Sequence, residues 1–256
     1  MNIDNEIKLD FDDVLLVPQR STISSRQQVE LSRRFKFYHS PKDWHGLPLM
    51  AANMDATGTF QMGAALSKYG AITCLHKHYD ADTISDYFKY YNIEKHVWIS
   101  IGMDLDELVK INKIADYLGY APNICIDIAN GYTERFTDWC ASVRQDFPES
   151  IIMAGNVCTP DMVSELILHG GVDIVKIGIG PGSACTTRLK AGVGYPQLSA
   201  IAECSHAAHG IRSGTGRLGL ICADGGCRYA ADVAKAYAAG ADFVMVGSLL
   251  AGTDES

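Results

Sequence analysis

The sequence predicts an α/β fold, a (β/α)8 TIM barrel, from three observations. From about residue 47 onward, short apolar runs alternate with longer segments of helical periodicity. The apolar runs are continuous, which is typical of parallel strands buried on both faces. Eight such units within about 200 residues fit a closed barrel. An open, doubly wound sheet is the alternative that the same alternation allows.

The expected strands are rich in Ile, Val, Ala and Met, and they occupy residues 47–54, 71–76, 97–102, 123–129, 151–156, 173–178, 218–223 and 242–247. Seven segments between them place apolar residues three and four positions apart, and these are the expected helices: 59–69, 82–91, 104–118, 133–147, 160–169, 196–209 and 230–239. Thr159 followed by Pro160 is a typical helix start. Four glycines stand where helices are expected to end: Gly70, Gly119, Gly170 and Gly240.

These elements give one catalytic barrel domain over residues 1–256. Residues 1–46 form an N-terminal capping segment, and residues 47–256 form the barrel. Eight strands and seven helices use the whole length. We therefore expect the last helix of the barrel to be missing or incomplete.

Composition excludes several classes of function. The 256 residues carry 22 basic and 30 acidic side chains, a net charge of −8, and no cluster of Lys and Arg that a nucleic acid would need. Eight cysteines with no CxxC pair indicate reduced thiols and a cytoplasmic protein. The N-terminus does not resemble a signal peptide, and no apolar stretch is long enough to cross a membrane.

The loop after the sixth strand is the strongest candidate for chemistry, because barrel active sites lie at the carboxyl ends of strands. Glycines free this loop to turn sharply, and Cys185 follows them. Arg188 is expected to favour its thiolate, while Thr186 and Thr187 offer hydroxyls for hydrogen bonding or proton relay. The alternative is that Cys185 is a small buried apolar residue. The other seven cysteines are interpreted as packing residues.

The loops after strands seven and eight carry Asp224-Gly225-Gly226 and Gly247-Ser248. Barrels commonly bind phosphate there through backbone N–H groups, and an Asp beside such a site can accept hydrogen bonds from ribose hydroxyls. The alternative is a pair of tight turns.

Two other motifs carry less weight. Residues 214–219 match GxGxxG, but they follow a helix and precede a strand, the reverse of the dinucleotide-binding order. His76 and His78 do not complete a metal site by themselves. Lys77 between them is a better candidate for a phosphate or carboxamide contact.

The segment Gly180-Pro181-Gly182-Ser183-Ala184-Cys185-Thr186-Thr187-Arg188 closely resembles the nucleophile loop of the IMP dehydrogenase/GMP reductase superfamily. The resemblance extends from residues 9–16 to residues 250–252. The match is closer to the reductases, in residues 51–55, 76–79, 127–132, 153–157 and 192–200. Only one helix fits between strands two and three, where dehydrogenases typically carry a regulatory insert.

The resemblance implies that the Cys185 thiolate attacks C2 of GMP, that Thr187 relays a proton to the departing ammonia, and that NADPH then delivers a hydride to give IMP. It implies contacts to GMP from Ser183, Asp224, Gly225, Gly226, Gly247 and Ser248. It implies contacts to NADPH from Ser25, Arg26, Lys77, Asp127, Ile128, Ala129, Ile179 and Gly180. It also implies a homotetramer and a K⁺ site at Gly180, Gly182, Cys185 and Arg188.

Family members continue past the position of Ser256 with a mobile flap, a Glu that partners the relay Thr, and the last barrel helix. Glu255 is too close to the eighth strand to take the role of that Glu. We expect this chain to lack the flap segment. Two alternatives stay open. One is an IMP dehydrogenase, in which water instead of hydride reacts with the covalent thioimidate formed on the cysteine. The other is a non-catalytic nucleotide-binding barrel.

Overall fold

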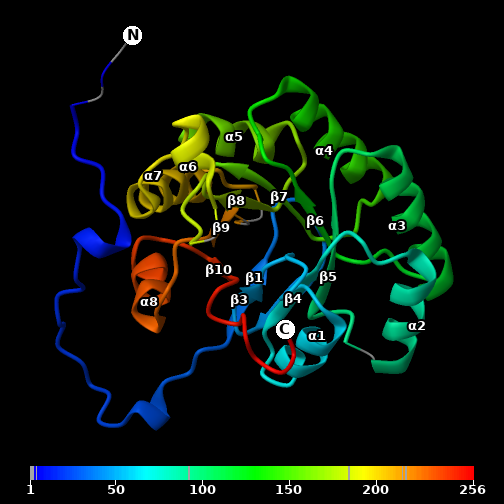
Figure 1. Cartoon of the computed structure of the whole chain (residues 1–256), viewed down its shortest axis with the longest axis horizontal. Helices are drawn as coiled ribbons and strands as arrows, with labels where there is room; N and C mark the ends of the chain where they lie inside the picture. Colours follow the sequence, from blue (N-terminus) through cyan, green and yellow to red (C-terminus); the bar gives the residue numbers. More distant parts are fainter. Residues whose placement is uncertain (1–2, 4, 92, 184, 215, 217) are drawn as a thin grey trace.

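A computed structural model describes residues 3, 5–91, 93–183, 185–214, 216 and 218–256. Eight parallel strands close into a barrel in the order β10-β3-β4-β5-β6-β7-β8-β9 (Figure 1). They are β3 (Leu49–Ala51), β4 (Ile72–Leu75), β5 (Val97–Ile101), β6 (Ile124–Asp127), β7 (Ile152–Val157), β8 (Ile174–Ile177), β9 (Leu220–Asp224) and β10 (Phe243–Val246). The closing pair β10–β3 confirms the predicted barrel and excludes the open sheet.

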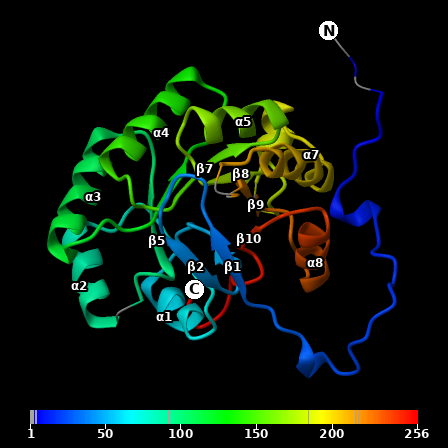
Figure 2. The same cartoon turned by 180° about the vertical axis from the view of Figure 1, so that it is seen from behind.

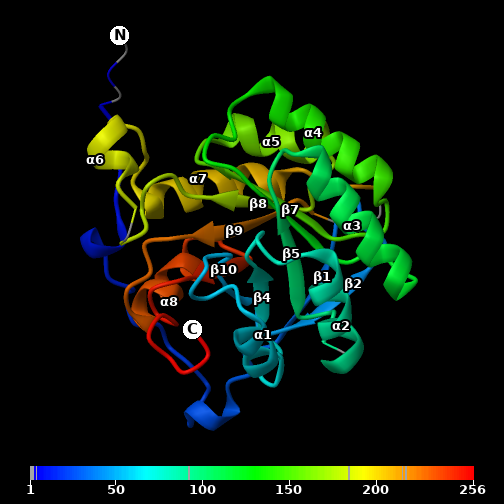
Figure 3. The same cartoon turned by 45° about the vertical axis from the view of Figure 1, so that its right-hand side comes forward.

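Helices cover the outside of the barrel in the predicted places (Figures 1 and 2). They are α1 (Phe60–Ser67), α2 (Ala81–Tyr91), α3 (Leu105–Leu118), α4 (Glu134–Asp146), α5 (Pro160–Leu168), α7 (Gln197–Gly210) and α8 (Ala230–Ala238). The short helix α6 (Thr187–Ala191) was not predicted, and Figure 3 shows it beside the N-terminal segment. In the described residues no helix follows β10, as expected. Residues 248–255 instead make turns, and the Glu255 carbonyl accepts a hydrogen bond from the Thr59 hydroxyl.

Helix α5 starts as predicted, with Thr159 as the N-cap residue and Pro160 as the first helical residue. The Thr159 side chain makes no capping bond and accepts one from the Tyr132 hydroxyl. After α5, the left-handed backbone is at Gly171 (φ +69°), one residue later than expected. Helix α5 ends at Leu168, and His169 still has right-handed helical backbone angles. The left-handed residue that turns the chain away from the helix is therefore Gly171.

Strand side chains divide into two packed layers, as alternation requires. Ile99, Ile126 and Val175 face the helices, whereas Trp98, Cys125 and Met153 belong to a second cluster. Seven cysteines are buried, in agreement with the packing interpretation, and Cys185 is exposed.

The first 46 residues contain an antiparallel hairpin, β1 (Arg33–Lys36) and β2 (Asp43–Gly46), seen in front of the barrel in Figure 2. Trp44 is buried and packs edge-on against Phe243 of β10, with ring centroids 5.5 Å apart. Upstream are the 3-10 turns η1 (Phe11–Asp13) and η2 (Arg26–Gln28). The chain between η1 and β1 runs apart from the barrel in Figure 1.

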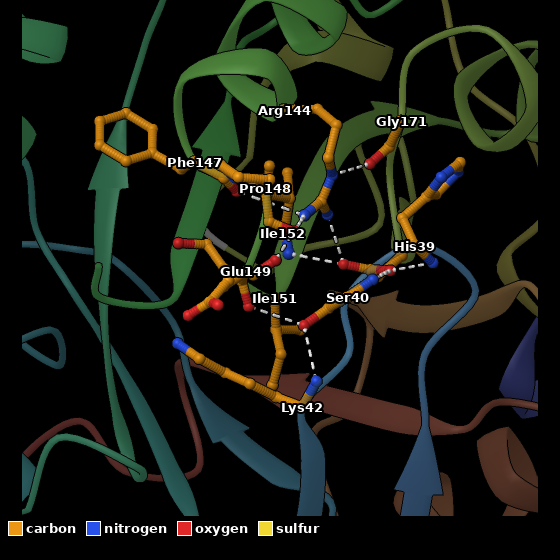
Figure 4. Close-up of polar contacts among 12 residues, drawn as sticks. His39, Ser40, Lys42, Arg144, Phe147, Pro148, Glu149, Ile151, Ile152 and Gly171 are labelled. Carbon is orange, nitrogen blue, oxygen red and sulfur yellow. Dashed lines mark hydrogen bonds and ion pairs between the residues drawn. The ribbon is translucent and has the colours of Figure 1, made fainter. Parts of the chain in front are cut away.

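A buried ion pair joins the capping segment to the barrel (Figure 4). The Asp173 carboxylate is fully buried and accepts from the backbone N–H groups of His39, Ser40 and Ile152. It also accepts from Arg144 Nη2 at 2.6 Å. Arg144 in turn donates to the carbonyl oxygens of Phe147, Pro148, Ser150 and Gly171. This carboxylate therefore ties together residues 39–40, the end of α4 and the start of β7.

A second pair, His209 with Asp242, makes stability depend on pH. His209 Nε2 lies 2.9 Å from Asp242 Oδ2, and this hydrogen bond raises the pKa of His209 above its ordinary 6.5. Because the pKa of His209 is higher in the folded than in the unfolded protein, the pair stabilises the fold fully below pH 6.5. This stabilisation is lost as the pH rises through the pKa of the folded state. The ring is 35% exposed, so solvent screening limits the contribution to below about 1 kcal/mol.

We therefore expect His209→Gln to lower the melting temperature more at about pH 6 than at about pH 8. His206→Gln, an exposed position on the same helix, is the matched control and should change neither value. An equal loss at both pH values in His209→Gln would show that the pair does not titrate in this range.

No helix among the described residues combines the length and the apolar character needed to span a membrane.

Candidate functional site

Glycines give the loop after β8 its shape. Gly178 has φ +144°, and a Cβ there would lie 2.2 Å from the Asp224 carbonyl oxygen. Gly180 has φ +75°, and a Cβ would lie 2.6 Å from the Arg188 side chain. A side chain at either position would be strained and would collide, so only glycine lets the loop fold back over the barrel mouth. The loop then presents Cys185 to solvent.

The Cys185 thiol is paired with Thr187. Its Sγ lies 3.2 Å from Thr187 Oγ1, so the thiol donates to this hydroxyl and the thiolate accepts from it. The pKa of Cys185 is lowered, chiefly by hydrogen bonding to the Thr187 side chain and then to its backbone. Burial opposes the shift, and the charge of Arg188 adds a smaller favourable effect. The expected effect of Arg188 on the thiolate is therefore present, but it is smaller than that of Thr187, which is in direct contact.

The Arg188 guanidinium faces the N-terminal segment instead. Its Nη1 pairs with Asp10 Oδ2 at 3.1 Å, and Nη2 donates to the Tyr195 carbonyl. Asp10 Oδ1 also accepts from the Gln197 backbone N–H, at the start of α7. Asp10 was missed by sequence reasoning, although it lies inside the N-terminal stretch that resembles the family. The Asp10 carboxylate therefore contacts both Arg188 in α6 and Gln197 at the start of α7.

Thr187→Val should raise the pKa of Cys185, because it removes the hydrogen bond that favours the thiolate. We expect the rate of alkylation by iodoacetamide to reach half its plateau at a higher pH than in the parent protein. Thr186→Val is the matched control, since Thr186 is the exposed neighbouring residue. Identical alkylation profiles for Thr187→Val and the parent would contradict the assignment. The other thiols are buried and should react far more slowly.

Cys185 and Thr187 line a cavity of about 400 Å³ at the carboxyl ends of the strands. The described residues that share it are Asp127, Ile128, Ala129, Asn156, Gly178, Ile179, Gly180, Pro181, Gly182, Asp224 and Gly225. The structure therefore brings together the expected nucleophile, two expected substrate contacts and five expected cofactor contacts. A larger cavity of about 630 Å³ lies under β2 at the opposite end of the barrel. It contains no cysteine, so we assign the chemistry to the smaller one.

Two carboxylates that line this cavity, Asp127 and Asp224, share the buried cation Lys176. Lys176 Nζ lies 3.0 Å from Asp127 Oδ1 and 3.2 Å from Asp224 Oδ2. Burial opposes ionisation of Asp127, but the charge of Lys176 outweighs it and leaves the pKa of Asp127 lowered. Burial likewise opposes the charge on Lys176, yet the two carboxylates raise its pKa. The pKa shifts of Asp127 and Lys176 therefore both favour their charged forms.

Lys176, Asn53 and Asn156 are functional candidates that the sequence analysis did not select. Asn53 Nδ2 donates to Asp127 Oδ2, and Asn156 Nδ2 donates to Asp224 Oδ2 and to the Gly178 carbonyl. Lys176 could have been selected from the sequence, because it lies within the apolar run Ile174-Val175-Lys176-Ile177 and a charged side chain in a buried strand needs partners of opposite charge.

Other predicted residues lie outside this cavity. A Cβ at Gly226 would lie 3.3 Å from the Phe11 ring and 3.4 Å from Pro181, and the Ser248 hydroxyl donates to the Cys227 carbonyl. The remaining ones are Ser25, Arg26, Lys77, Ser183, Arg188 and Gly247, none of which is among the described residues that line it. Ser25 and Arg26 lie at η2 in the exposed N-terminal stretch. Ala184 of the nucleophile loop lies outside the described residues.

Neither of the discounted motifs reaches the cavity. Gly214 follows α7 and precedes β9, the order expected from the sequence, while Thr215 and Arg217 lie outside the described residues. The His76 ring stacks on Tyr79 with centroids 4.0 Å apart, and His78 pairs with Asp55 at 3.6 Å. Within the described residues there is no group of three or more His, Cys, Asp or Glu side chains arranged for a metal.

Comparison with known proteins gives consistent matches. Residues 8–256 match the model of the IMP dehydrogenase / GMP reductase domain. A GMP reductase of Shewanella halifaxensis (strain HAW-EB4) is 50% identical over 258 residues, which span 100% of this chain and 72% of the relative. One of Vibrio atlanticus (strain LGP32) is 52% identical with the same coverage. The crystal structure of inosine 5' monophosphate dehydrogenase from Legionella pneumophila superposes with a TM-score of 0.81 at 33% identity, covering 97% of this chain and 72% of that one.

Proposed function

Because this chain belongs to the IMP dehydrogenase/GMP reductase family, we propose that it catalyses the NADPH-dependent reductive deamination of GMP to IMP and ammonia, in purine nucleotide interconversion. The observation that carries this proposal is the single cavity shared by Cys185, Thr187, Asp127 and Asp224. A nucleophile with a lowered pKa lies there beside an ionised carboxylate. The relatives that are about half identical bear the name GMP reductase.

The proposed reaction begins with attack of the Cys185 thiolate on C2 of the guanine ring, which forms an S–C bond and makes that carbon tetrahedral. The 2-amino group then leaves as ammonia and takes up protons, one of them through the Thr187 hydroxyl. A thioimidate on Cys185 is left. NADPH supplies the hydride that C2 needs, after which the S–C bond breaks and the thiolate returns. In sum, GMP, NADPH and two protons give IMP, NADP⁺ and an ammonium ion.

The substrate-side residues have chemistry suited to a nucleotide. Asp224 is a carboxylate that accepts hydrogen bonds, and we assign it to the ribose hydroxyls. Backbone N–H groups of Gly225, Gly226 and Gly247, with Ser183 and Ser248, are assigned to the phosphate. Gly225 and Gly226 have φ of +87° and +85°, a left-handed backbone that glycine adopts without strain.

The cofactor-side cavity wall is formed by Asp127, Ile128, Ala129, Ile179 and Gly180. An anionic carboxylate with adjacent backbone groups fits the hydrogen-bond donors of a nicotinamide nucleotide. Lys77, Arg26 and Ser25 are assigned to the additional phosphate of NADPH, because cations and hydroxyls bind phosphate.

For K⁺, we propose the backbone carbonyls of Gly180, Gly182, Cys185 and Arg188, since hard cations prefer oxygen ligands. The Gly182 and Arg188 carbonyls already accept bonds from the Cys185 and Gly192 N–H groups, and each oxygen keeps a second lone pair. The donor set therefore fits a monovalent cation.

We also propose a cytoplasmic homotetramer. Leu15 is 86% exposed and Val17 is 75% exposed in the N-terminal stretch between η1 and β1, and Leu31 is exposed further along. Exposed large apolar side chains along one stretch support the proposal that another copy covers it. Light scattering coupled to gel filtration measures the assembly directly.

The reaction is tested by incubating the protein with GMP and NADPH. The expected result is loss of the absorbance of reduced nicotinamide, with an equal amount of ammonia formed. Formation of NADH from IMP and NAD⁺ without ammonia would favour an IMP dehydrogenase. Binding of GMP with no product in either assay would favour a non-catalytic nucleotide-binding barrel.

A further inference from the structure

Lys176 is a buried cation between two strand-end carboxylates. It lies on β8, is 1% exposed, and is not among the residues that line the cavity. Asp127 at the end of β6 and Asp224 at the end of β9 both do line it. The ammonium is 3.0 Å from one carboxylate and 3.2 Å from the other. One positive charge beneath the cavity is therefore shared by two negative charges that face into it.

The hydrogen bonds set the orientation of each carboxylate. Asp127 accepts from Lys176 on Oδ1 and from Asn53 on Oδ2 at 2.6 Å. Asp224 faces Lys176 and Asn156 with the same oxygen, Oδ2. Among the described residues, the side-chain contacts of Asp224 thus fall on Oδ2 and leave Oδ1 for a ligand. Each carboxylate therefore has an ion pair with Lys176 and a hydrogen bond from one asparagine, Asn53 for Asp127 and Asn156 for Asp224.

We propose that Lys176 is a positioning residue that fixes Asp127 and Asp224 together, so that one side chain supports binding of both the nucleotide substrate and the nicotinamide cofactor. This inference rests on the proposed function, which places GMP against Asp224 and NADPH against Asp127. Removal of the ammonium leaves two partly buried carboxylates without a cation. Such a pair repels, and one member turns away or takes up a proton.

The test measures the dissociation constants of GMP and of NADPH separately, in a Cys185→Ser background that binds without turnover. We expect Lys176→Met to raise both constants, each on the order of tenfold, the usual effect of losing a hydrogen bond to a charged group. Asn53→Ala is the matched control: it loosens Asp127 alone, so only the constant for NADPH should rise. A folded Lys176→Met protein in which one constant, or neither, changes would overturn the proposal.

Lys176→Met alone adds net negative charge to the buried cluster and can fail to fold. The double variant Lys176→Met/Asp127→Asn keeps the net charge of the cluster and is compared with Asp127→Asn. We expect weaker GMP binding in the double variant, on the order of tenfold, because Asp224 has lost its cation. Equal GMP affinities in these two proteins would also overturn the inference. Failure of the background protein itself to bind GMP or NADPH would instead refute the proposed function.

Discussion

Cys185→Ser is expected to reduce turnover of GMP by on the order of 10⁴-fold or more, while GMP binding changes little. A serine hydroxyl is not ionised at neutral pH, and no general base among the described residues contacts this position. The thiol, in contrast, has a lowered pKa and a hydrogen-bonded partner in Thr187. Because the side chain is exposed at a loop, the replacement should leave the fold intact.

Cys227→Ser is the matched control for this experiment. Cys227 is buried two residues after Gly225, and burial raises its pKa to about 12, so it cannot supply a thiolate near neutral pH. Its replacement should retain most of the activity. Turnover in Cys185→Ser close to the parent value would remove Cys185 from the mechanism.

Asp173→Asn is expected to lower the free energy of unfolding by about 3–5 kcal/mol, the largest stability effect among the ion pairs described here. The substitution leaves the Arg144 guanidinium buried without its counter-ion. An asparagine N–H₂ group would also face donors at either oxygen position, because Oδ1 accepts from the N–H groups of His39 and Ser40, and Oδ2 accepts from Arg144 and the Ile152 N–H. Urea unfolding measures the loss as a lower midpoint with an unchanged slope.

Asp12→Asn provides the comparison, because Asp12 pairs with Arg228 at the surface and both side chains are largely exposed. Its loss should cost less than about 1 kcal/mol. Adding Arg144→Met to Asp173→Asn should recover only part of the stability, since the backbone donors remain unsatisfied. A loss below about 1 kcal/mol for Asp173→Asn would contradict the view that this carboxylate holds the capping segment.

Sequence pattern was sufficient for the barrel because each strand and each long helix has its own periodicity. The run at 97–102 is β5, and the segment at 104–118 is α3, within one or two residues. Helix α6 was missed because five residues in a glycine-rich loop are too few to show a helical period.

The site was predictable where its residues are close in the chain. Cys185 and Thr187 are two residues apart, and their loop position made Cys185 a candidate nucleophile beside the alternative of a buried packing residue, which its exposure excludes. The cluster of Asp127, Lys176 and Asp224 was not predictable in the same way. These residues come from β6, β8 and β9, and only the closed barrel brings them together. The pair of Asp10 with Arg188, 178 positions apart in the chain, depends likewise on tertiary packing.

A single-turnover experiment tests the central claim most directly. The protein, in excess over GMP, is mixed with NADPH, and the products are quantified after quenching. The account predicts IMP, ammonia and NADP⁺ in equal amounts, and none of them from the Cys185→Ser protein under the same conditions. Recovery of intact GMP from a parent protein that demonstrably binds both GMP and NADPH would contradict it.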